Sequence, residues 1–157
     1  ITLNPILQSF CLTQIEKNIP QHLVDTFLHS MKMDLGDIKN FNDEKYNEYI
    51  YGSAEVVGLM CLKVFVNGNV EEYDTLKPYA QSLGAAFQKI NFLRDISADF
   101  NDLNRMYFPN VDFRKFSSQA KKQIEADIAK DFAHAFIGIK MLPISSRIAV
   151  FMAYKYY

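Results

Sequence analysis

Residues 88–99 read QKINFLRDISAD, and this stretch decides which fold and which kind of site to expect. Asp95 and Asp99 lie four positions apart, and the amide side chains of Gln88 and Asn91 precede them. A helix turns about 100° per residue, so, with position 88 as zero, Asn91 lies at about −60°. Asp95 and Asp99 then lie at about −20° and about +20°. A helix therefore aligns all four oxygen-bearing side chains in one stripe.

This stripe has two interpretations. Mg²⁺ binds one or two carboxylates and leaves positions for water and phosphate oxygens, so Asp95 and Asp99 are candidate metal ligands. The other interpretation is a solvated helix face, because acidic residues mostly lie on protein surfaces. The pattern alone does not choose between them.

The bulk composition limits the class of protein. With 157 residues, of which 49% are apolar and 22% charged, the chain is long enough for one globular domain with a core. A net charge of −1 provides no basic excess for nucleic-acid binding. The longest apolar run, residues 56–66, is shorter than the ~20 residues that a membrane span needs. Cys11 and Cys61 lie among apolar residues without a CxxC pattern, which favours buried thiols.

The spacing of apolar residues predicts helices throughout. Glycine and proline are few, with six and five residues, and no alternation typical of strands persists. Asn4 followed by Pro5 is a typical helix start, as is Asn42 or Asp43. The sequence therefore predicts a single all-α domain over residues 1–157. The helices are expected at residues 5–18, 20–34, 43–67, 75–99, 117–140 and 144–157.

Three blocks of the chain resemble the squalene/phytoene synthase family. Residues 88–109, QKINFLRDISADFNDLNRMYFP, resemble the family's second aspartate-rich motif, Q-x-x-N-x-x-R-D-x-x-x-D followed by R-x-Y-x-P. Residues 49–60, YIYGSAEVVGLM, resemble its Y-C-Y-x-V-A-G-x-V-G helix, although Ser53 replaces a valine and Glu55 a small residue. Residues 31–35, MKMDL, resemble the M-x-M-D-L of bacterial phytoene synthases.

The resemblance implies an isoprenoid synthase-type helical bundle around a central cavity. It also implies the head-to-head joining of two isoprenoid diphosphates through a cyclopropyl diphosphate. Two geranylgeranyl diphosphates giving phytoene is the expected reaction. Squalene or dehydrosqualene formation from farnesyl diphosphate, or a non-catalytic synthase-like subunit, is the alternative. The implied cofactor is Mg²⁺, with Mn²⁺ as a substitute, whereas NADPH is not expected.

The same motif implies roles for its polar residues. Asp95 and Asp99 would be catalytic metal ligands, while Gln88 and Asn91 would orient water or phosphate oxygens. Arg94 would brace the acidic pair or form a structural ion pair elsewhere. Arg105 and Tyr107, on the loop after the helix, are implied to contact the diphosphate. A surface salt bridge is the simpler alternative for the arginine at position 105.

The second block implies residues that face the cavity. Tyr49 would be a catalytic residue that shapes the carbocation or relays a proton, with a purely structural tyrosine as the alternative. Ala54, Val57 and Gly58 would line the cavity and admit prenyl chains, although the same small residues would also suit helix packing. Tyr157 is expected to line the cavity as well, by its register in the last helix.

The family's first aspartate-rich motif has no counterpart in these residues. We therefore expect the chain to be an incomplete segment of a longer synthase domain. This segment alone is expected to be inactive. The expected partners are isoprenoid diphosphates, with no nucleic acid, and the sequence leaves the oligomeric state open. A cytoplasmic location is expected, with peripheral contact at the inner face of the cell membrane as a further expectation.

Overall fold

The computed structural model describes residues 4–35, 41–103, 107–109 and 117–157, and for residues 96–103 it describes the backbone alone. All regular structure in these ranges is helical and none is strand, which confirms the all-α prediction. The elements in chain order are α1 (Pro5–Glu16), α2 (Gln21–Met33), α3 (Asp43–Ile50), the π-helix η1 (Tyr51–Glu55), α4 (Val56–Phe65), α5 (Val70–Leu103), α6 (Ser118–Met141) and α7 (Ile144–Tyr156).

Side-chain caps fix three of the predicted helix starts. The Asn4 side chain accepts hydrogen bonds from two backbone N–H groups of the first turn of α1, at 2.9 and 3.2 Å. The Asn42 side chain accepts one from Lys45 at 2.9 Å, and the Ser117 hydroxyl accepts one from Ala120 at 3.1 Å. Each cap satisfies N–H groups that lack a partner within the helix.

The predicted helix over residues 43–67 is continuous in direction but not uniform. Within it, η1 is a short π-helix, and the Val56 N–H donates to the carbonyl of Tyr51, five residues earlier. Such π turns occur mostly as single turns inside α-helices, frequently at functional sites. The segment ends where Asn67 and Gly68 adopt positive φ angles of 49° and 76°.

The predicted helix over residues 75–99 is wrong at both ends, because α5 spans Val70–Leu103. The side chain of Asn69 accepts a hydrogen bond from the Glu72 N–H at 3.2 Å, so the helix starts one turn earlier than predicted. Two acidic residues in the first turn also favour this start, because they complement the helix dipole. Pro78 lies inside α5 without ending it.

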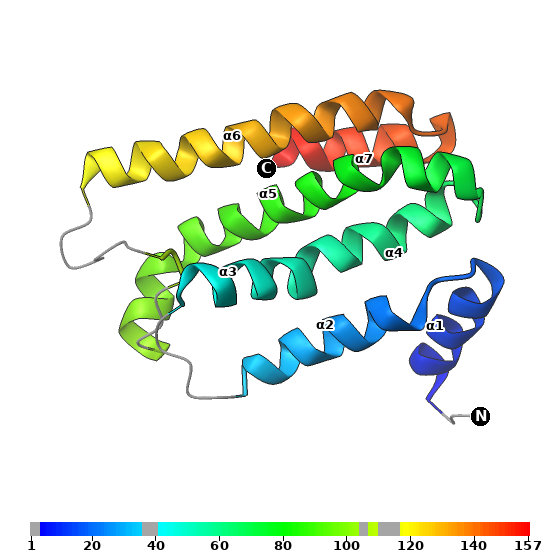
Figure 1. Cartoon of the computed structure of the whole chain (residues 1–157), viewed down its shortest axis with the longest axis horizontal. Helices are drawn as coiled ribbons and strands as arrows, with labels where there is room; N and C mark the ends of the chain where they lie inside the picture. The colour runs from blue at the N-terminus through cyan, green and yellow to red at the C-terminus, as the bar shows by residue number, and fades with distance from the viewer. Residues whose placement is uncertain (1–3, 36–40, 104–106, 110–116) are drawn as a thin grey trace.

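The long helix α5 runs the length of the molecule between α6 and α4 (Figure 1). α7 folds back beside α6, and α2 lies on the other side of α4 (Figure 1). One core cluster joins α2, α4 and the start of α5, and Leu23, Val56 and Leu59 are its most deeply buried members. A second, largely aromatic cluster lies between α3 and α5.

The first helix departs from the expectation of buried thiols. α1 has no buried residue and lies at one end of the molecule, beyond α2 (Figure 1). Cys11 on this helix is therefore exposed, and Cys61 on α4 is exposed as well, so the prediction of buried thiols is wrong for both. Across the described ranges, no helix combines the length and apolar character needed to cross a membrane.

Candidate functional site

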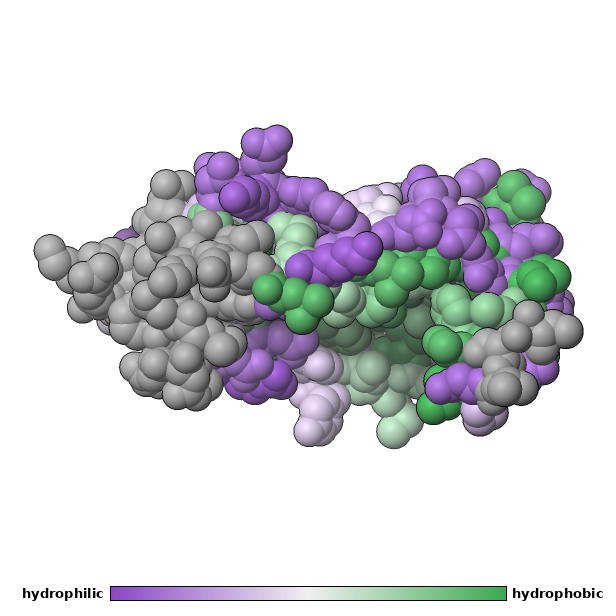
Figure 2. Space-filling view, turned by 90° about the horizontal axis from the view of Figure 1, so that it is seen from below, coloured by the Kyte–Doolittle hydropathy of each residue, from purple (hydrophilic) through white to green (hydrophobic). Residues whose placement is uncertain are grey.

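A cavity of about 380 Å³ lies alongside α5 and is lined by η1 and α4 on one side and by α6 and α7 on the other. Seen from below the molecule, the surface is hollowed between walls that are mainly hydrophobic (Figure 2). Ligand pockets are typically about 300–1,000 Å³ and mostly apolar, with few polar groups. The cavity therefore has the size and lining of a site for an apolar ligand.

The cavity follows one face of α5 for several turns. The α5 residues on this face include Leu76, Ala80, Gly84, Gln88 and Asn91. From the first to the last of them the helix rises by about 22 Å. An extended apolar chain laid along α5 therefore matches the shape of this wall.

The two ends of the cavity differ in chemistry. One end is closed by apolar residues, among them Leu62, Phe65 and Leu142. The other end carries the amides of Gln88 and Asn91, as the helical stripe predicts. The lining therefore changes from apolar to polar along α5, toward the acidic residues of the motif.

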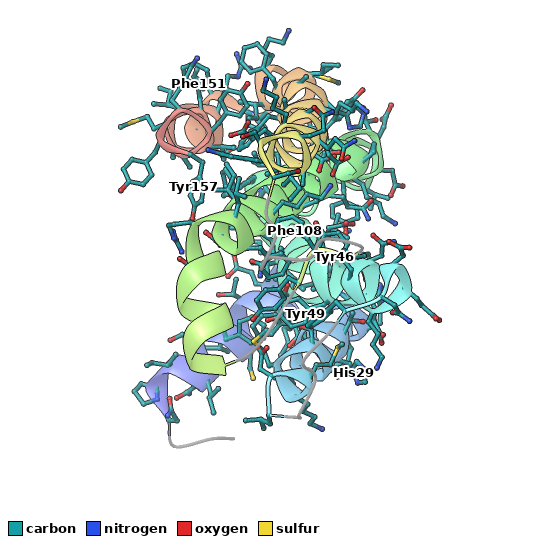
Figure 3. The ribbon with its side chains drawn as sticks, turned by 90° about the vertical axis from the view of Figure 1, so that its left-hand side faces the viewer. His29, Tyr46, Tyr49, Phe108, Phe151 and Tyr157 are labelled. Carbon is teal, nitrogen blue, oxygen red and sulfur yellow. The ribbon has the colours of Figure 1, made fainter. Side chains whose placement is uncertain are left out.

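Tyr157 completes the polar end, as predicted from its register. Its ring stacks on Phe87 with centroids 4.3 Å apart, and its hydroxyl donates a long hydrogen bond of 3.4 Å to Asn91 Oδ1. The labelled side chain extends from α7 toward α5 (Figure 3). One amide oxygen of the stripe is thus already held in place by a residue from another helix.

The small residues of the second block line the cavity, and they also let the helices approach closely. A Cβ atom on Gly58 would lie 2.8 Å from the backbone oxygen of Ala80 on α5. A Cβ on Gly84 would lie 2.6 Å from the backbone oxygen of Ala54. Ala54, Val57 and Gly58 therefore line the cavity, and Ala54 and Gly58 also pack closely against α5, whereas their role in admitting prenyl chains stays a prediction.

The first aspartate of the pair is braced by its neighbour. Arg94 Nε donates to one Asp95 carboxylate oxygen at 2.7 Å, and Arg94 Nη2 donates to the other at 2.8 Å. These hydrogen bonds lower the pKa of Asp95, so the carboxylate stays ionised. The structure thus shows Arg94 paired with Asp95, and its role toward the acidic pair as a whole stays a prediction.

Carboxylate oxygens such as those of Asp95 are ligands that suit a hard cation. Each oxygen of Asp95 accepts one bond from Arg94 and keeps a lone pair free for a further partner. Asp99 lies one turn further along the same helix, but its side chain and Arg105 lie outside the described residues. Among the described side chains, no three His, Cys, Asp or Glu residues form a group that could hold a metal.

Two predicted site tyrosines lie in the aromatic cluster instead of lining this cavity. Tyr49 and Tyr107 are buried, with 6% and 8% of their surface exposed. Tyr107 stacks on Phe92 with centroids 4.1 Å apart, and the Tyr49 hydroxyl lies 2.9 and 3.0 Å from the Asp34 carboxylate oxygens. Figure 3 labels Tyr46, Tyr49 and Phe108 in this part of the molecule, with Tyr46 between the other two labels. Their roles in catalysis and substrate binding stay predictions.

Sequence reasoning missed a polar cluster on the opposite side of α5. Glu55, one of the two departures from the family pattern, accepts a hydrogen bond of 2.9 Å from Gln81. Burial raises the pKa of Glu55, and the Gln81 hydrogen bond opposes the rise. Nearby, Lys89 Nζ forms ion pairs with Asp127 at 2.5 Å and Asp131 at 2.7 Å on α6.

A second missed feature is Ser53, the other departure from the family pattern. Its Oγ is buried in the cavity wall and has no hydrogen-bond partner among the described residues. An unpaired buried hydroxyl is costly, so a polar atom of a ligand would find a partner there. The replacement of an apolar residue by serine was the signal in the sequence.

Comparison with known proteins identifies the family of the chain. The family model for squalene/phytoene synthase matches residues 2–157. A squalene synthase from Schizosaccharomyces pombe is 34% identical over 77 residues, which cover 48% of this chain and 16% of the relative. A 4,4'-diapophytoene synthase from Staphylococcus haemolyticus is 31% identical over 85 residues, covering 54% and 28%.

A bifunctional lycopene cyclase/phytoene synthase from Blakeslea trispora is 27% identical over 128 residues, covering 81% of this chain and 21% of the relative. The chain thus matches between 16% and 28% of the length of these three proteins. No solved structure gave a significant match. Because the family model matches nearly every residue, the chain belongs to the squalene/phytoene synthase family.

Proposed function

We propose that the protein joins two isoprenoid diphosphates head to head, with two geranylgeranyl diphosphates giving phytoene as the preferred reaction. The observation that carries the proposal is the cavity along α5, which is apolar over most of its length and polar at the end nearest Asp95. A prenyl diphosphate has the same polarity, with a long apolar tail and a charged head. Family membership supports the reaction class.

The residues of the cavity would bind the tail and the head separately. The tail would lie along the wall of α5 that includes Ala80 and Gly84. The head would lie near Gln88 and Asn91, whose amide groups donate and accept hydrogen bonds. Asn91 is held by Tyr157, so this polar end is partly ordered before any substrate binds.

The acidic stripe would hold Mg²⁺, or Mn²⁺ in its place, through Asp95 and Asp99. The bound metal would supply Lewis-acid assistance to departure of the diphosphate. Arg94 would keep Asp95 ionised and fix the direction of its carboxylate. Tyr49 would shape the carbocation or relay a proton, and Tyr107 would contact the diphosphate, both from the aromatic cluster beside this cavity.

The experiment is a product assay of the complete protein. It is incubated with Mg²⁺ and either geranylgeranyl or farnesyl diphosphate, with and without NADPH, and the hydrocarbons are identified by mass spectrometry. We expect phytoene from the longer substrate and no dependence on NADPH. If the protein instead forms squalene or dehydrosqualene from farnesyl diphosphate, the alternative reaction is correct and phytoene formation is not. No product from either substrate, in a folded protein, would favour the non-catalytic subunit.

A further inference from the structure

The hydroxyl oxygen of Ser53 is the one buried side-chain N or O atom without a hydrogen-bond partner among the residues that the structure describes. Ser53 belongs to the π turn η1 and lines the cavity. Other serine hydroxyls in these helices donate to a backbone carbonyl three or four residues earlier, and they lie at positions 9, 30, 82 and 146. In the described part of the chain Ser53 makes no such bond, so its hydroxyl is available to a ligand.

The packing of the helices places Ser53 toward the polar end of the cavity. A Cβ on Gly84 of α5 would lie 2.6 Å from the backbone oxygen of Ala54, and a Cβ on Gly58 would lie 2.8 Å from that of Ala80. The wall of η1 and α4 therefore runs antiparallel to α5, and lower residue numbers on this wall face higher numbers on α5. Ser53 thus lies beyond Gly84, in the direction of the two amides.

We propose that the Ser53 hydroxyl donates a hydrogen bond to the ester oxygen that joins the diphosphate to the prenyl chain. This inference rests on the proposed function, in which Gln88 and Asn91 bind the head while the wall of α5 binds the tail. Ser53 lies between these two regions, because Gln88 is only one helical turn, about 6 Å, beyond Gly84. The ester oxygen is the polar atom of the substrate nearest to the tail. Rotation about the Cα–Cβ bond turns the hydroxyl toward it, since Ser53 itself lines the cavity.

This hydrogen bond assists the first chemical step. The bond between C1 and the ester oxygen breaks, its electron pair stays on the oxygen, and an allylic cation remains. Negative charge develops on the oxygen, so the donor binds it more strongly in the transition state than in the bound substrate. Ser53 keeps its proton throughout and acts only as a donor. It is therefore a catalytic residue on the wall opposite α5.

The first experiment measures thermal melting of the complete protein without substrate. Ser53→Ala removes the unpaired hydroxyl, so we expect it to melt on the order of 2 °C higher than the unaltered protein. The control is Ser82→Ala, which makes the same replacement on a helix where the hydroxyl already contacts Pro78 and His134. It corrects for the higher helix propensity of alanine. A rise no larger than that of the control, or a fall, would show that Ser53 already has a partner in the complete protein and would overturn the proposal.

The second experiment measures affinity by isothermal titration, with EDTA present to prevent turnover. The ligands are geranylgeranyl diphosphate and its thiolo analogue, in which sulfur replaces the ester oxygen. Ser53→Ala should bind the diphosphate about fivefold more weakly than the unaltered protein does. It should bind the thiolo analogue within about twofold, because sulfur is a weak acceptor. An unchanged affinity for the diphosphate, an equal loss with both ligands, or no binding of the diphosphate by the unaltered protein would each contradict the proposed contact.

Turnover with Mg²⁺ separates this inference from the proposed function. Ser53→Ala should lower kcat on the order of 100-fold with a much smaller change in KM, whereas Ser82→Ala should keep kcat within about twofold. If Ser53→Ala and the unaltered protein form product equally fast, the contact is wrong and the proposed function holds. If neither forms product but the loss of affinity is specific to the oxygen ester, the contact holds and the proposed function fails.

Discussion

The Tyr49 hydroxyl lies 2.9 and 3.0 Å from the two carboxylate oxygens of Asp34. The two residues come from different blocks of the sequence, on either side of residues 36–40, and meet where α2 ends and α3 ends. The carboxylate is an acceptor, so the tyrosine must donate its proton to it. The phenol is thereby fixed in orientation, with its oxygen lone pairs directed away from Asp34.

Removal of the Tyr49 hydroxyl tests whether this group acts in the reaction or only stabilises the fold. In Tyr49→Phe the ring keeps its contacts with Phe41 and Phe92, so we expect melting within a few degrees of the unaltered protein. Turnover should fall by about tenfold or more if the hydroxyl acts in the reaction. Steady-state rates and thermal melting of the complete protein are the measurements.

Asp34→Asn provides the companion variant, because it keeps the shape and removes the charge. The double variant should lose less stability than the sum of the single variants, by about 1 kcal/mol or more. Normal turnover in Tyr49→Phe would leave Tyr49 a purely structural residue.

Asp99→Asn, and likewise Asp95→Asn, should reduce turnover strongly while the fold is kept. Losing ~3 kcal/mol of transition-state stabilisation slows the reaction by roughly 100-fold. Part of the loss should return at high Mg²⁺ concentration, because a weaker ligand set is less saturated. Turnover is measured against Mg²⁺ concentration, together with thermal melting.

The control for the acidic pair is Asp127→Asn. Asp127 and Asp131 have the same four-residue spacing on a helix, but both bind Lys89. Replacement there should leave the Mg²⁺ dependence unchanged. If Asp99→Asn also leaves it unchanged, the motif is a solvated helix face and not a metal site.

Phe65 should limit the length of the prenyl chain. It lies at the apolar end of the cavity, so Phe65→Ala would extend the space beyond the end of the bound tail. We expect the preference to shift toward a substrate one isoprene unit longer, by about tenfold in kcat/KM, measured in competition between the two substrates. Val64→Ala is the control, because Val64 is the neighbouring residue on α4 and does not line the cavity. An equal shift in both variants would contradict the proposed direction of the tail.

Glu55 should make stability depend on pH in an identifiable direction. Burial raises its pKa in the folded protein above the usual value of 4.5, so ionisation is harder in the folded than in the unfolded chain. Its contribution therefore favours folding below pH 4.5 and is lost as the pH rises through the raised pKa. Glu55→Gln keeps a hydrogen-bond partner for Gln81 and removes the ionisation.

Thermal melting at acid and neutral pH tests this expectation. The variant should melt higher than the unaltered protein at neutral pH, on the order of 2 °C, and no higher at pH 4. Glu125→Gln, at an exposed position within α6, serves as the control. A rise that is the same at both pH values would show that burial of the charge is not the cause.

Local signals in the sequence were sufficient for most of the fold. Asn4 and Asn42 cap helices where the residue types predict helix starts, because a cap depends on its own first turn, and Ser117 caps the helix that was expected from residue 117. The start of α5 was missed because Asn69 follows directly after the Asn67-Gly68 stop signal. Asn67 and Gly68 end one helix with positive φ angles, and Asn69, the next residue, caps the start of α5.

Part of the site was predictable for the same reason. Gln88 and Asn91 lie on the helical stripe, and the stripe continues toward Ala80 and Leu76 at the same spacing. The polar cluster was not predictable, because the partners of Lys89 lie on α6, 38 and 42 positions away. The bond between Tyr49 and Asp34 likewise depends on how α2 and α3 pack.

The π turn at Tyr51–Glu55 joins α3 to α4 and determines how the side chains of α3 are rotated about the helix axis relative to those of α4. Deletion of one residue from this turn would convert it into an ordinary α turn and rotate α3 by about 100° relative to α4. Tyr49 would then leave the aromatic cluster, or Ala54 and Gly58 would leave the cavity wall. The number of residues between Tyr49 and Gly58 is therefore as important as their identity, because it determines which side chains face the aromatic cluster and which face the cavity.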